Sequence, residues 1–217
     1  MILAAIALVL ATLIGIPLGV ISGARAGGLA ATVIRTLSIA VLSLPPLLTS
    51  LLLVFIAART GWLPIGGMRS TGLDGGGLTD LVRHLVVPVL AIALPMAATL
   101  ERLQAQSMSE VIGQPFVNAS RARGVPWTRI VWRDALLVAI KPVTALYGVM
   151  VATVLSGSFA VEIVTAWPGL GRLMLDALRV RDVYLVAGCA ATGAIFLAIG
   201  TLLSDLATAA VDPRVRS

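Results

Sequence analysis

Few side chains in this sequence could perform chemistry, and their spacing does not predict a catalytic site. A phosphate-binding loop of the P-loop type requires a Gly-Lys step, but the only lysine, Lys141, follows an isoleucine. One histidine, His84, and one cysteine, Cys189, are too few for a zinc or copper site. The Ser-Gly-Ser step at 156–158 would need a facing base to act as a nucleophile, and His84 is expected at a helix end. We therefore predict neither an enzyme nor a cofactor or metal bound to this chain.

The composition is typical of a membrane protein. Of the 217 residues, 59% are apolar and 12% are charged, and the mean hydropathy is +1.02. Soluble domains contain about 45–50% apolar and about 25% charged residues. A formal net charge of +6 would suggest nucleic acid as a partner of a soluble protein. Here the positive residues lie mainly between apolar runs, so we relate the charge to membrane orientation and predict no nucleic-acid partner.

Five uncharged runs are candidates for transmembrane helices. A bilayer core about 30 Å thick requires roughly 20 helical residues. Four of the runs reach that length, and the third is expected to extend through Arg83 and His84, whose side chains can reach the headgroups. The five expected spans are 1–24, 36–58, 85–100, 142–161 and 183–204. The sequence therefore predicts an all-α fold, a polytopic transmembrane helical bundle.

Positive charge is distributed unevenly between the segments that connect these spans. Segments 23–35, 102–141 and 212–217 contain ten Lys and Arg residues, whereas 59–84 and 162–182 contain six. Lys and Arg are enriched on the cytoplasmic side of membranes. We therefore expect the N-terminus outside, the C-terminus and the loop 102–141 in the cytoplasm, and outer loops at 59–84 and 162–182.

Small residues and prolines suggest how the spans pack. Two rows of small residues at four-residue spacing are Gly15, Gly19 and Gly23, and Gly148, Ala152 and Ser156. Such rows let helix backbones approach closely in lipid. Prolines in the spans, including the Pro45-Pro46 pair, are expected to kink helices. A bundle around a pathway that opens and closes and a static bundle both fit these patterns. The glycine-rich outer loop 61–77 is expected to be mobile and is assigned no role.

No charged residue is predicted to lie deep inside a span, since Glu101, Arg102 and Asp205 all fall near expected cytoplasmic ends. Transporters driven by ion gradients usually contain a carboxylate or a relay within the membrane. The pattern therefore argues against drive by an ion gradient. Because no charge precedes Arg25, we also expect a further span upstream of Met1.

The segment 110–124 predicts a short cytoplasmic helix. Pro115 suits the first helical position, and Gly124 suits the position just after the last turn. Residues at positions i, i+3, i+4 and i+7 lie on the same face of a helix. One face of the predicted helix would therefore contain Phe116, Ala119, Ser120 and Arg123. A face with one large apolar side chain suits docking in a groove of a partner protein. The alternative is an amphipathic helix that lies on the lipid surface.

The same segment resembles the EAA loop of ABC importer permeases. Residues 113–124 read G-Q-P-F-V-N-A-S-R-A-R-G, which is similar to the peptide and nickel branch of that family. Two further stretches, 162–172 and 212–216, also resemble this branch, and in particular the B-type permease of dipeptide and oligopeptide importers. The likeness covers essentially the whole chain from the family's second span onward. Asn118 replaces the glutamate of the motif, and Leu137 lies where many EAA loops have proline.

The resemblance implies that residues 1–217 form an ABC transporter permease domain in a bacterial cell membrane. It implies a homologous permease subunit, two cytoplasmic ATPase subunits and an extracytoplasmic solute-binding protein as partners, with ATP and magnesium held by the ATPases. The substrate would be a dipeptide, an oligopeptide, a nickel chelate or glutathione. A self-contained secondary transporter or channel is the main alternative, and a membrane assembly factor is a weaker one.

The resemblance also implies roles for two sets of residues. The ATPase-coupling helix would contain Phe116, Asn118, Ala119, Ser120, Arg121, Arg123 and Gly124. Phe116 would be the packing anchor, and Arg121 and Arg123 would pair with acidic residues of the ATPase. The outer turn near the binding protein would contain Glu162, Trp167, Pro168, Gly169 and Gly171. Anchoring of Trp167 in the membrane interface is the alternative for this turn.

Overall fold

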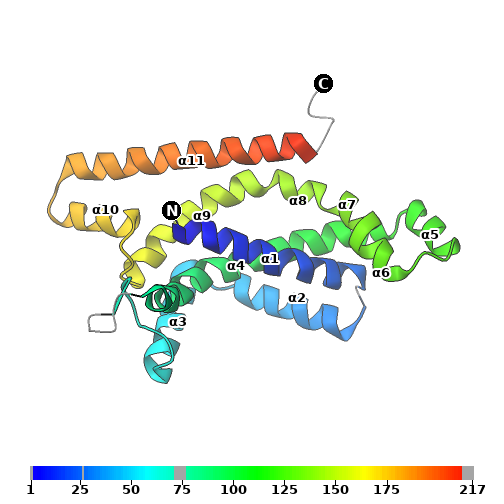
Figure 1. The fold of residues 1–217 in the computed structure, drawn as a ribbon, viewed down its shortest axis with the longest axis horizontal. Coiled ribbons are helices and arrows are strands. Elements are labelled where there is room, and N and C mark those ends of the chain that lie inside the picture. The colour runs from blue at the N-terminus through cyan, green and yellow to red at the C-terminus, as the bar shows by residue number, and fades with distance from the viewer. Residues whose placement is uncertain (1, 26, 71–76, 212–217) are drawn as a thin grey trace. The chain divides into compact units, whose positions relative to one another are not determined.

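The chain folds into helices with no strand in the residues that the computed structural model describes, which are 2–25, 27–70 and 77–211. Figure 1 shows their order along the chain. The helices are α1 (Ile2–Ala24), α2 (Leu29–Leu42), α3 (Pro46–Thr60), α4 (Leu78–Ile112), α5 (Pro115–Ala122), α6 (Trp127–Arg129), a π-helical segment η1 (Ile130–Ala135), α7 (Leu136–Ala139), α8 (Lys141–Ala145), α9 (Tyr147–Val164), α10 (Leu170–Arg179) and α11 (Val183–Val211).

Four of these helices are long and apolar enough to cross a membrane. They are α1, α4, α9 and residues Val183–Leu202 of α11, and a fifth span results if α2 and α3 are counted as one bent pair. The prediction of an all-α chain with several membrane-spanning helices is confirmed. Among the described residues the number of candidate spans is thus four, or up to five.

The second expected span, 36–58, is not one helix. It is divided between α2 and α3, which end and begin around the Pro45-Pro46 pair. Pro46 is the first residue of α3, and Pro45 has the extended conformation of a residue that precedes proline, with φ −58° and ψ 149°. Because neither proline has an N–H to donate, the ladder of helical hydrogen bonds cannot continue through this point.

Helix α4 is longer than the third expected span. It comprises 35 residues and continues without interruption through Pro88 and Pro95. The predicted extension through Arg83 and His84 is confirmed, and the helix also includes residues up to Ile112, which the sequence placed in the connecting loop. The apolar run 85–100 therefore covers only the middle of α4, because the helix continues into polar turns on both sides of the run.

Two compact units, which share α1, α4, α9 and α11 between them, are described separately. The first contains the start of α1 up to Val9, Leu44–Pro95 and Val151–Gly200; the second contains Leu10–Ser43, Met96–Met150 and the part of α11 from Thr201. Within the second unit, α1 and α4 pack through the predicted row of glycines. A Cβ atom added to Gly15 would lie 2.6 Å from the carbonyl oxygen of Ala97, and one added to Gly23 would lie 2.5 Å from that of Ala105. The absence of a side chain thus permits this close packing.

The core of the second unit lies where α1 and α4 meet the π-helical segment η1. Its buried side chains are Val20, Met108, Val111, Val131, Ala135 and Ala139. The hydroxyl of Ser107 donates a 2.8 Å hydrogen bond to the carbonyl oxygen of Ala139, where the interruption at Ile140 follows. The second predicted row of small residues stays a prediction, because the side chain of Ser156 lies outside those described.

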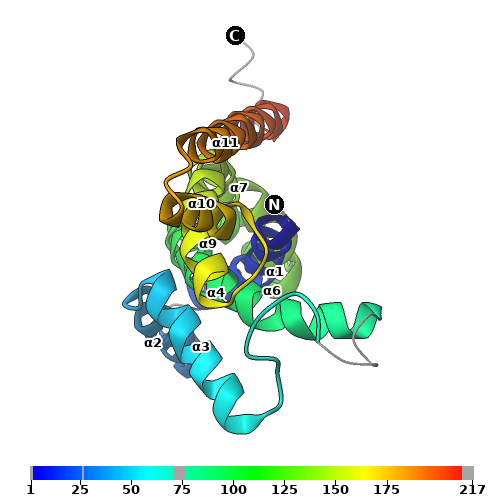
Figure 2. The same cartoon turned by 90° about the vertical axis from the view of Figure 1, so that its left-hand side faces the viewer.

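In the first unit, α10 lies beside the end of α9, as both Figure 1 and Figure 2 show. A Cβ atom added to Gly171 would lie 2.5 Å from the Cα of Phe159. Gly200 of α11 lies similarly close to the side chain of Val151 in α9. Glycine therefore allows α10 and α11 to pack directly against α9.

Candidate functional site

Helix α5 is the short helix that the sequence predicted between Pro115 and Gly124. Pro115 is its first residue, and Gln114 precedes it in an extended conformation with φ −77° and ψ 151°. Proline fits this position because the first N–H groups of a helix have no partner within the helix. The start of α5 is therefore determined by backbone chemistry, without a side-chain cap.

The C-terminal end of α5 is a Schellman motif. Gly124 has a left-handed conformation, with φ +78°. Its N–H donates to the carbonyl oxygen of Arg121 at 2.9 Å, and the N–H of Val125 donates to that of Ser120 at 3.2 Å. No atom lies within 4 Å of a Cβ added to Gly124, so the requirement for glycine is conformational. The predicted position of Gly124 just after the helix is confirmed.

The predicted face of α5 is divided between exposed and buried residues. Val117 and Ser120 are 1% and 6% exposed and point toward the interior of the unit, whereas Phe116 is 36% exposed. The hydroxyl of Ser120 accepts a 3.0 Å hydrogen bond from Nη2 of Arg123. Of the four residues that the spacing places on one face, Ser120 is thus buried beside Val117, whereas Phe116, Ala119 and Arg123 are exposed.

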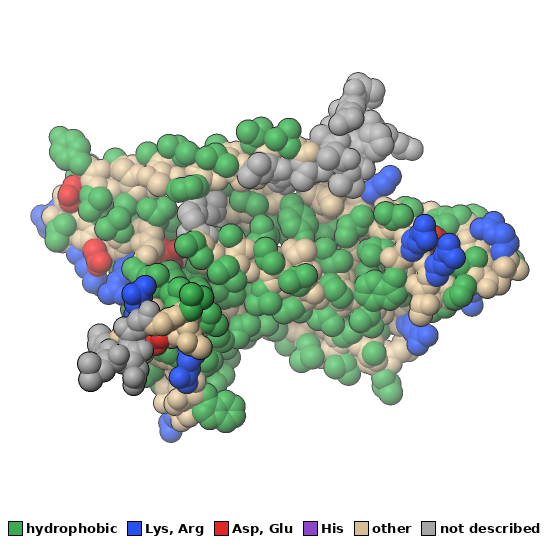
Figure 3. Space-filling view, viewed as in Figure 1, with side chains coloured by type: hydrophobic (Ala, Val, Ile, Leu, Met, Phe, Trp, Pro, Cys, Tyr) green, Lys and Arg blue, Asp and Glu red, His purple; other side chains and the backbone are tan. Residues whose placement is uncertain are grey.

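The exposed residues of α5 include most of the predicted coupling residues. Besides Phe116, the exposed coupling residues are Asn118, Ala119 and Arg121 within α5, and Arg123 and Gly124 directly after it. The guanidinium of Arg121 lies over the ring of Trp127, with its central carbon 5.1 Å from the ring centroid. Figure 3 shows positive side chains gathered over α5 and α6, and Arg129 at the end of α6 and Arg133 in η1 are also exposed. This surface combines the partly exposed ring of Phe116 with several exposed cations, of which Arg121 and Arg123 are oriented by contacts within the chain.

The segment that follows α5 packs against it. Helix α6 begins after Pro126 and leads into η1, against which α5 packs. Ile130 is fully buried, and Val131 belongs to the apolar core. Sequence reasoning did not identify Val117 or Trp127 as part of this arrangement. The Pro-Trp step two residues after Gly124 is the signal that a second helix begins there.

The second set of predicted residues forms one compact turn between α9 and α10. Helix α9 ends in another Schellman motif, in which the N–H of Trp167 donates to the carbonyl oxygen of Glu162 at 2.9 Å and that of Ala166 donates to Ile163 at 3.3 Å. Ala166 has a φ of +53°, a conformation that usually requires glycine. Nη1 of Arg172 donates a hydrogen bond to the carbonyl oxygen of Ala166 and so helps to hold this residue in its left-handed conformation.

The carboxylate of Glu162 is buried in this turn at the start of α10. The residue is 2% exposed, and Oε2 accepts a 2.8 Å hydrogen bond from the N–H of Gly171. Gly169 is the N-cap residue of α10 and has no side chain to fill this role. A Cβ atom on Gly169 would overlap the Glu162 carboxylate. Glu162 thus serves as a remote cap, and its negative charge faces the positive end of the helix dipole.

The turn contains all five predicted outer residues, but Trp167 is not exposed. Its side chain is covered by the chain itself, leaving the residue 8% exposed. Trp167 therefore does not present its ring to the surroundings as an interfacial anchor would. Pro168 is exposed between Trp167 and Gly169. Phe159, Thr165 and Arg172 also build the turn and were not identified from the sequence.

Hydrogen bonds join residues 61–70 to neighbouring elements, and the expected mobility of this loop stays a prediction. Gly67 donates its N–H to the carbonyl oxygen of Thr165 at 2.9 Å, beside the α9–α10 turn. Asp80 accepts hydrogen bonds from the N–H and hydroxyl of Ser70 at 2.9 and 2.8 Å. Asp80 also lies 3.3 Å from Nδ1 of the buried His84. The remainder of the predicted loop, 71–76, lies outside the described residues.

Nothing in the described part of the chain resembles a metal site, because no group of three or more His, Cys, Asp or Glu residues could hold an ion there. The arrangement has instead two exposed structural features. One is a short helix with defined ends, and the other is a compact turn that carries a ten-residue helix.

Comparison with known proteins gives one consistent result. Residues 15–217 match the family described as the inner membrane component of binding-protein-dependent transport systems. A peptide permease protein of Brucella ovis, named as putative, is 33% identical over 217 residues, which are 100% of this chain and 68% of that protein. The oligopeptide transport system permease protein of Mycobacterium tuberculosis strain H37Rv is 34% identical over 218 residues, covering 96% of this chain and 67% of the relative.

A third relative, the dipeptide transport system permease protein of Escherichia coli K12, is 29% identical over 231 residues. That match covers 97% of this chain and 68% of the relative. The chain therefore spans about two thirds of the length of these relatives. All three names describe peptide transport.

Proposed function

The chain belongs to the family of binding-protein-dependent transport system inner membrane components, and from this premise we propose that it is one transmembrane subunit of an ATP-driven importer. A second, homologous permease subunit forms the translocation path together with it. Two cytoplasmic ATPase subunits bind and hydrolyse ATP with magnesium, and an extracytoplasmic solute-binding protein delivers the substrate. The membrane is the bacterial inner membrane, as the family description indicates.

The substrate in this proposal is a peptide or a related small solute. Support comes from the relatives, whose names specify peptide, oligopeptide or dipeptide transport. Their agreement favours peptides over nickel chelates and glutathione.

Helix α5 is the contact with an ATPase subunit. It is short, its two ends are fixed by Pro115 and Gly124, and its inward side is held by Val117. Such a helix can move as a rigid body when its partner moves. Phe116 inserts into a groove of the ATPase, and Ala119 allows close approach beside it. This placement requires α5 to be cytoplasmic, in agreement with the excess of Lys and Arg in 102–141.

The two arginines of α5 contribute to this contact in different ways. Arg121 is stacked on Trp127, and Arg123 is hydrogen-bonded to Ser120, so both side chains are oriented before the ATPase binds. Acidic residues of the ATPase would therefore meet cations that lose little conformational entropy on pairing. The pairs guide orientation, while the aromatic anchor supplies most of the affinity.

The α9–α10 turn is the contact region for the solute-binding protein. Glu162 connects the end of α9 to the start of α10 through the N–H of Gly171. A displacement of α10 on binding of the solute-binding protein would therefore also move the end of α9. Residues 61–70 add to the same surface, since Gly67 is bonded to Thr165.

The observation that carries the proposal is the match of residues 15–217 to the family, supported by the exposed helix α5. The test is isolation of the chain from its native membrane with a small affinity tag. Co-isolation of ATPase subunits and a second permease, with ATP hydrolysis that rises when loaded binding protein is added, would support the importer. Solute transport by the purified chain alone in liposomes, driven by an ion gradient, would instead favour a secondary transporter.

A further inference from the structure

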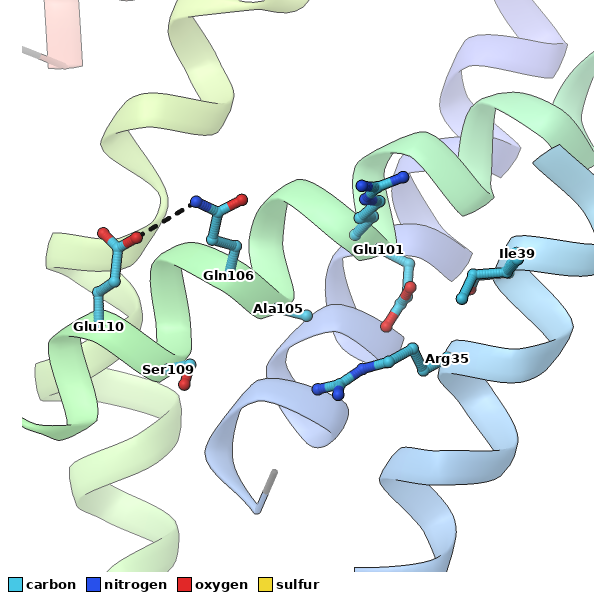
Figure 4. A pocket seen from close by; sticks show the side chains of 9 residues that line it. Arg35, Ile39, Glu101, Ala105, Gln106, Ser109 and Glu110 are labelled. Carbon is cyan, nitrogen blue, oxygen red and sulfur yellow. Dashed lines mark hydrogen bonds between the residues drawn. The ribbon is translucent and has the colours of Figure 1, made fainter. Parts of the chain in front are cut away.

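A polar pocket in the second unit contains charges of both signs that do not pair with each other. It lies between α2 and α4, and its lining includes Arg35, Ser38, Glu101, Arg102 and Glu110. Figure 4 shows the side chains of Arg35 and Glu101 pointing into the same space from the two helices. The volume of the pocket, about 630 Å³, is sufficient for a small polar molecule.

The buried carboxylate of Glu101 needs a cation. The residue is 2% exposed, and Oε1 accepts a 2.5 Å hydrogen bond from the hydroxyl of Ser22. Ion pairs within 4.0 Å among the described residues join Asp80 to His84 and Asp176 to Arg179. Glu101 is thus held by a neutral partner, although Arg35 lines the same pocket. A buried carboxylate without a positive partner is costly.

The cations of the pocket are likewise without a carboxylate partner in the described residues, because neither Arg35 nor Arg102 takes part in those ion pairs. The second carboxylate, Glu110, accepts a 3.3 Å hydrogen bond from Nε2 of Gln106. The lining therefore contains two positive and two negative groups, set apart from one another. A purely anionic ligand would be repelled by Glu101, and a purely cationic one by the arginines. The lining best matches a zwitterion.

The position of the pocket along the chain indicates the source of that zwitterion. Glu101 directly follows the apolar run that ends at Leu100, and Arg35 directly precedes the run that begins at Thr36. From these positions in the sequence, we place both residues at the boundary between membrane core and headgroups. Next to the pocket, α2 exposes Val33, Leu37 and Ile39. These apolar side chains offer a surface for acyl chains.

We propose that this pocket binds the headgroup of an aminophospholipid, with its phosphate on Arg35 and its ammonium on Glu101. Phosphatidylethanolamine has the matching chemistry, because its ammonium can donate hydrogen bonds to a carboxylate. Phosphatidylcholine has no such donor, and phosphatidylglycerol has no cation. The bound lipid fixes α2 beside α4 and completes the charge pairing of the pocket. This inference concerns the lipid contact of the chain and does not depend on the proposed transport function.

The test measures lipid binding to the purified full chain, alone and in its native assembly, by native mass spectrometry. Phosphatidylethanolamine, phosphatidylcholine and phosphatidylglycerol with identical acyl chains are titrated in turn. We expect phosphatidylethanolamine to bind about tenfold more tightly than the other two, as befits a charge-assisted hydrogen bond. Arg35→Gln and Glu101→Gln should each remove this preference. Arg129→Gln, which removes an exposed cation outside the pocket, should retain it.

Four results would overturn the proposal. One is equal binding of the three lipids by the unaltered chain, and another is an unchanged preference in the Arg35→Gln variant, which alters an exposed side chain. The third is displacement of bound phosphatidylethanolamine by free dialanine, which would assign the pocket to the termini of a peptide instead of a lipid. Loss of the preference on assembly would likewise show that another subunit fills the pocket.

Discussion

The carboxylate of Glu162 accepts a 2.8 Å hydrogen bond from the backbone N–H of Gly171 and thereby caps a helix to which it does not belong. Glu162 lies in α9, and Gly171 lies in the first turn of α10. Because the N-cap residue Gly169 has no side chain, this single contact replaces the usual local cap. The outer turn therefore depends on a residue whose position in the sequence gave no indication of capping.

Removal of this cap should loosen α10. We expect Glu162→Ala to destabilise the outer turn by about 1–2 kcal/mol, as loss of a helix cap typically does. Hydrogen exchange of the α10 amides should increase by roughly tenfold or more. The matched control is Asp176→Asn, which removes an exposed carboxylate paired with Arg179 on the surface of α10. Equal exchange rates in the two variants would contradict the capping role.

The glycine at position 171 is required by space rather than by conformation. A Cβ atom there would lie 2.5 Å from the Cα of Phe159, so Gly171→Ala must displace α10 from α9. We expect a loss of about 1–3 kcal/mol, typical of overpacking. Gly188→Ala in α11 is the control, since no atom lies within 4 Å of its Cβ. Thermal unfolding in detergent should show a lower midpoint for Gly171→Ala only, and an unchanged midpoint would exclude the close contact.

Position 124 differs from position 171, because glycine is required there only for its backbone conformation. With φ +78° and open space around the Cβ position, Gly124→Ala should cost about 1 kcal/mol and Gly124→Val more. Gly124→Asn should be tolerated best, because asparagine adopts left-handed conformations more readily. At equal protein levels, substrate uptake should therefore be highest in Gly124→Asn, lower in Gly124→Ala and lowest in Gly124→Val. Unchanged uptake in Gly124→Val would show that the end of α5 does not matter for transport.

Much of this architecture follows from the sequence, because the relevant signals are local. Pro115 and Gly124 define α5 through backbone chemistry alone, and the spacing of Gly15, Gly19 and Gly23 predicts a close contact with another helix, which the structure shows to be α4. The Pro45-Pro46 pair was expected to kink a single span, whereas the structure has two separate helices there, α2 and α3, because neither proline has an N–H to donate. The ends of α5 depend on residues that are close in sequence, and the glycine row is recognised by its regular spacing.

The remaining features depend on contacts between residues that are distant in sequence. Hydrogen bonds from Gly67 to Thr165 and from Ser70 to Asp80 connect the glycine-rich segment to other parts of the chain, which its composition did not indicate. The inward direction of Ser120 depends on where η1 lies. Spacing identifies residues that share a face, but only the packing shows which way that face points.

The proposed topology has a direct test. A single cysteine in place of Arg121, in a Cys189→Ala background, should not react with a membrane-impermeant maleimide added to intact cells. The residue is exposed on α5, so it should react readily once the membrane is opened. Pro168, which is exposed in the α9–α10 turn, provides the opposite control. Labelling at 121 but not at 168 in intact cells would reverse the proposed orientation.

The central claim is that α5 couples this chain to an ATPase through Phe116. An aromatic anchor truncated to alanine commonly costs about 2 kcal/mol or more at an interface, which corresponds to roughly thirty-fold in affinity. The control is Trp132→Ala, which removes an exposed aromatic side chain of η1 outside α5.

The measurement is ATP hydrolysis by the reconstituted assembly, with and without loaded solute-binding protein. For Phe116→Ala we predict weakened ATPase association and little stimulation by the binding protein, with stimulation retained in Trp132→Ala. Full stimulation in Phe116→Ala, at wild-type levels of assembled complex, would contradict the account.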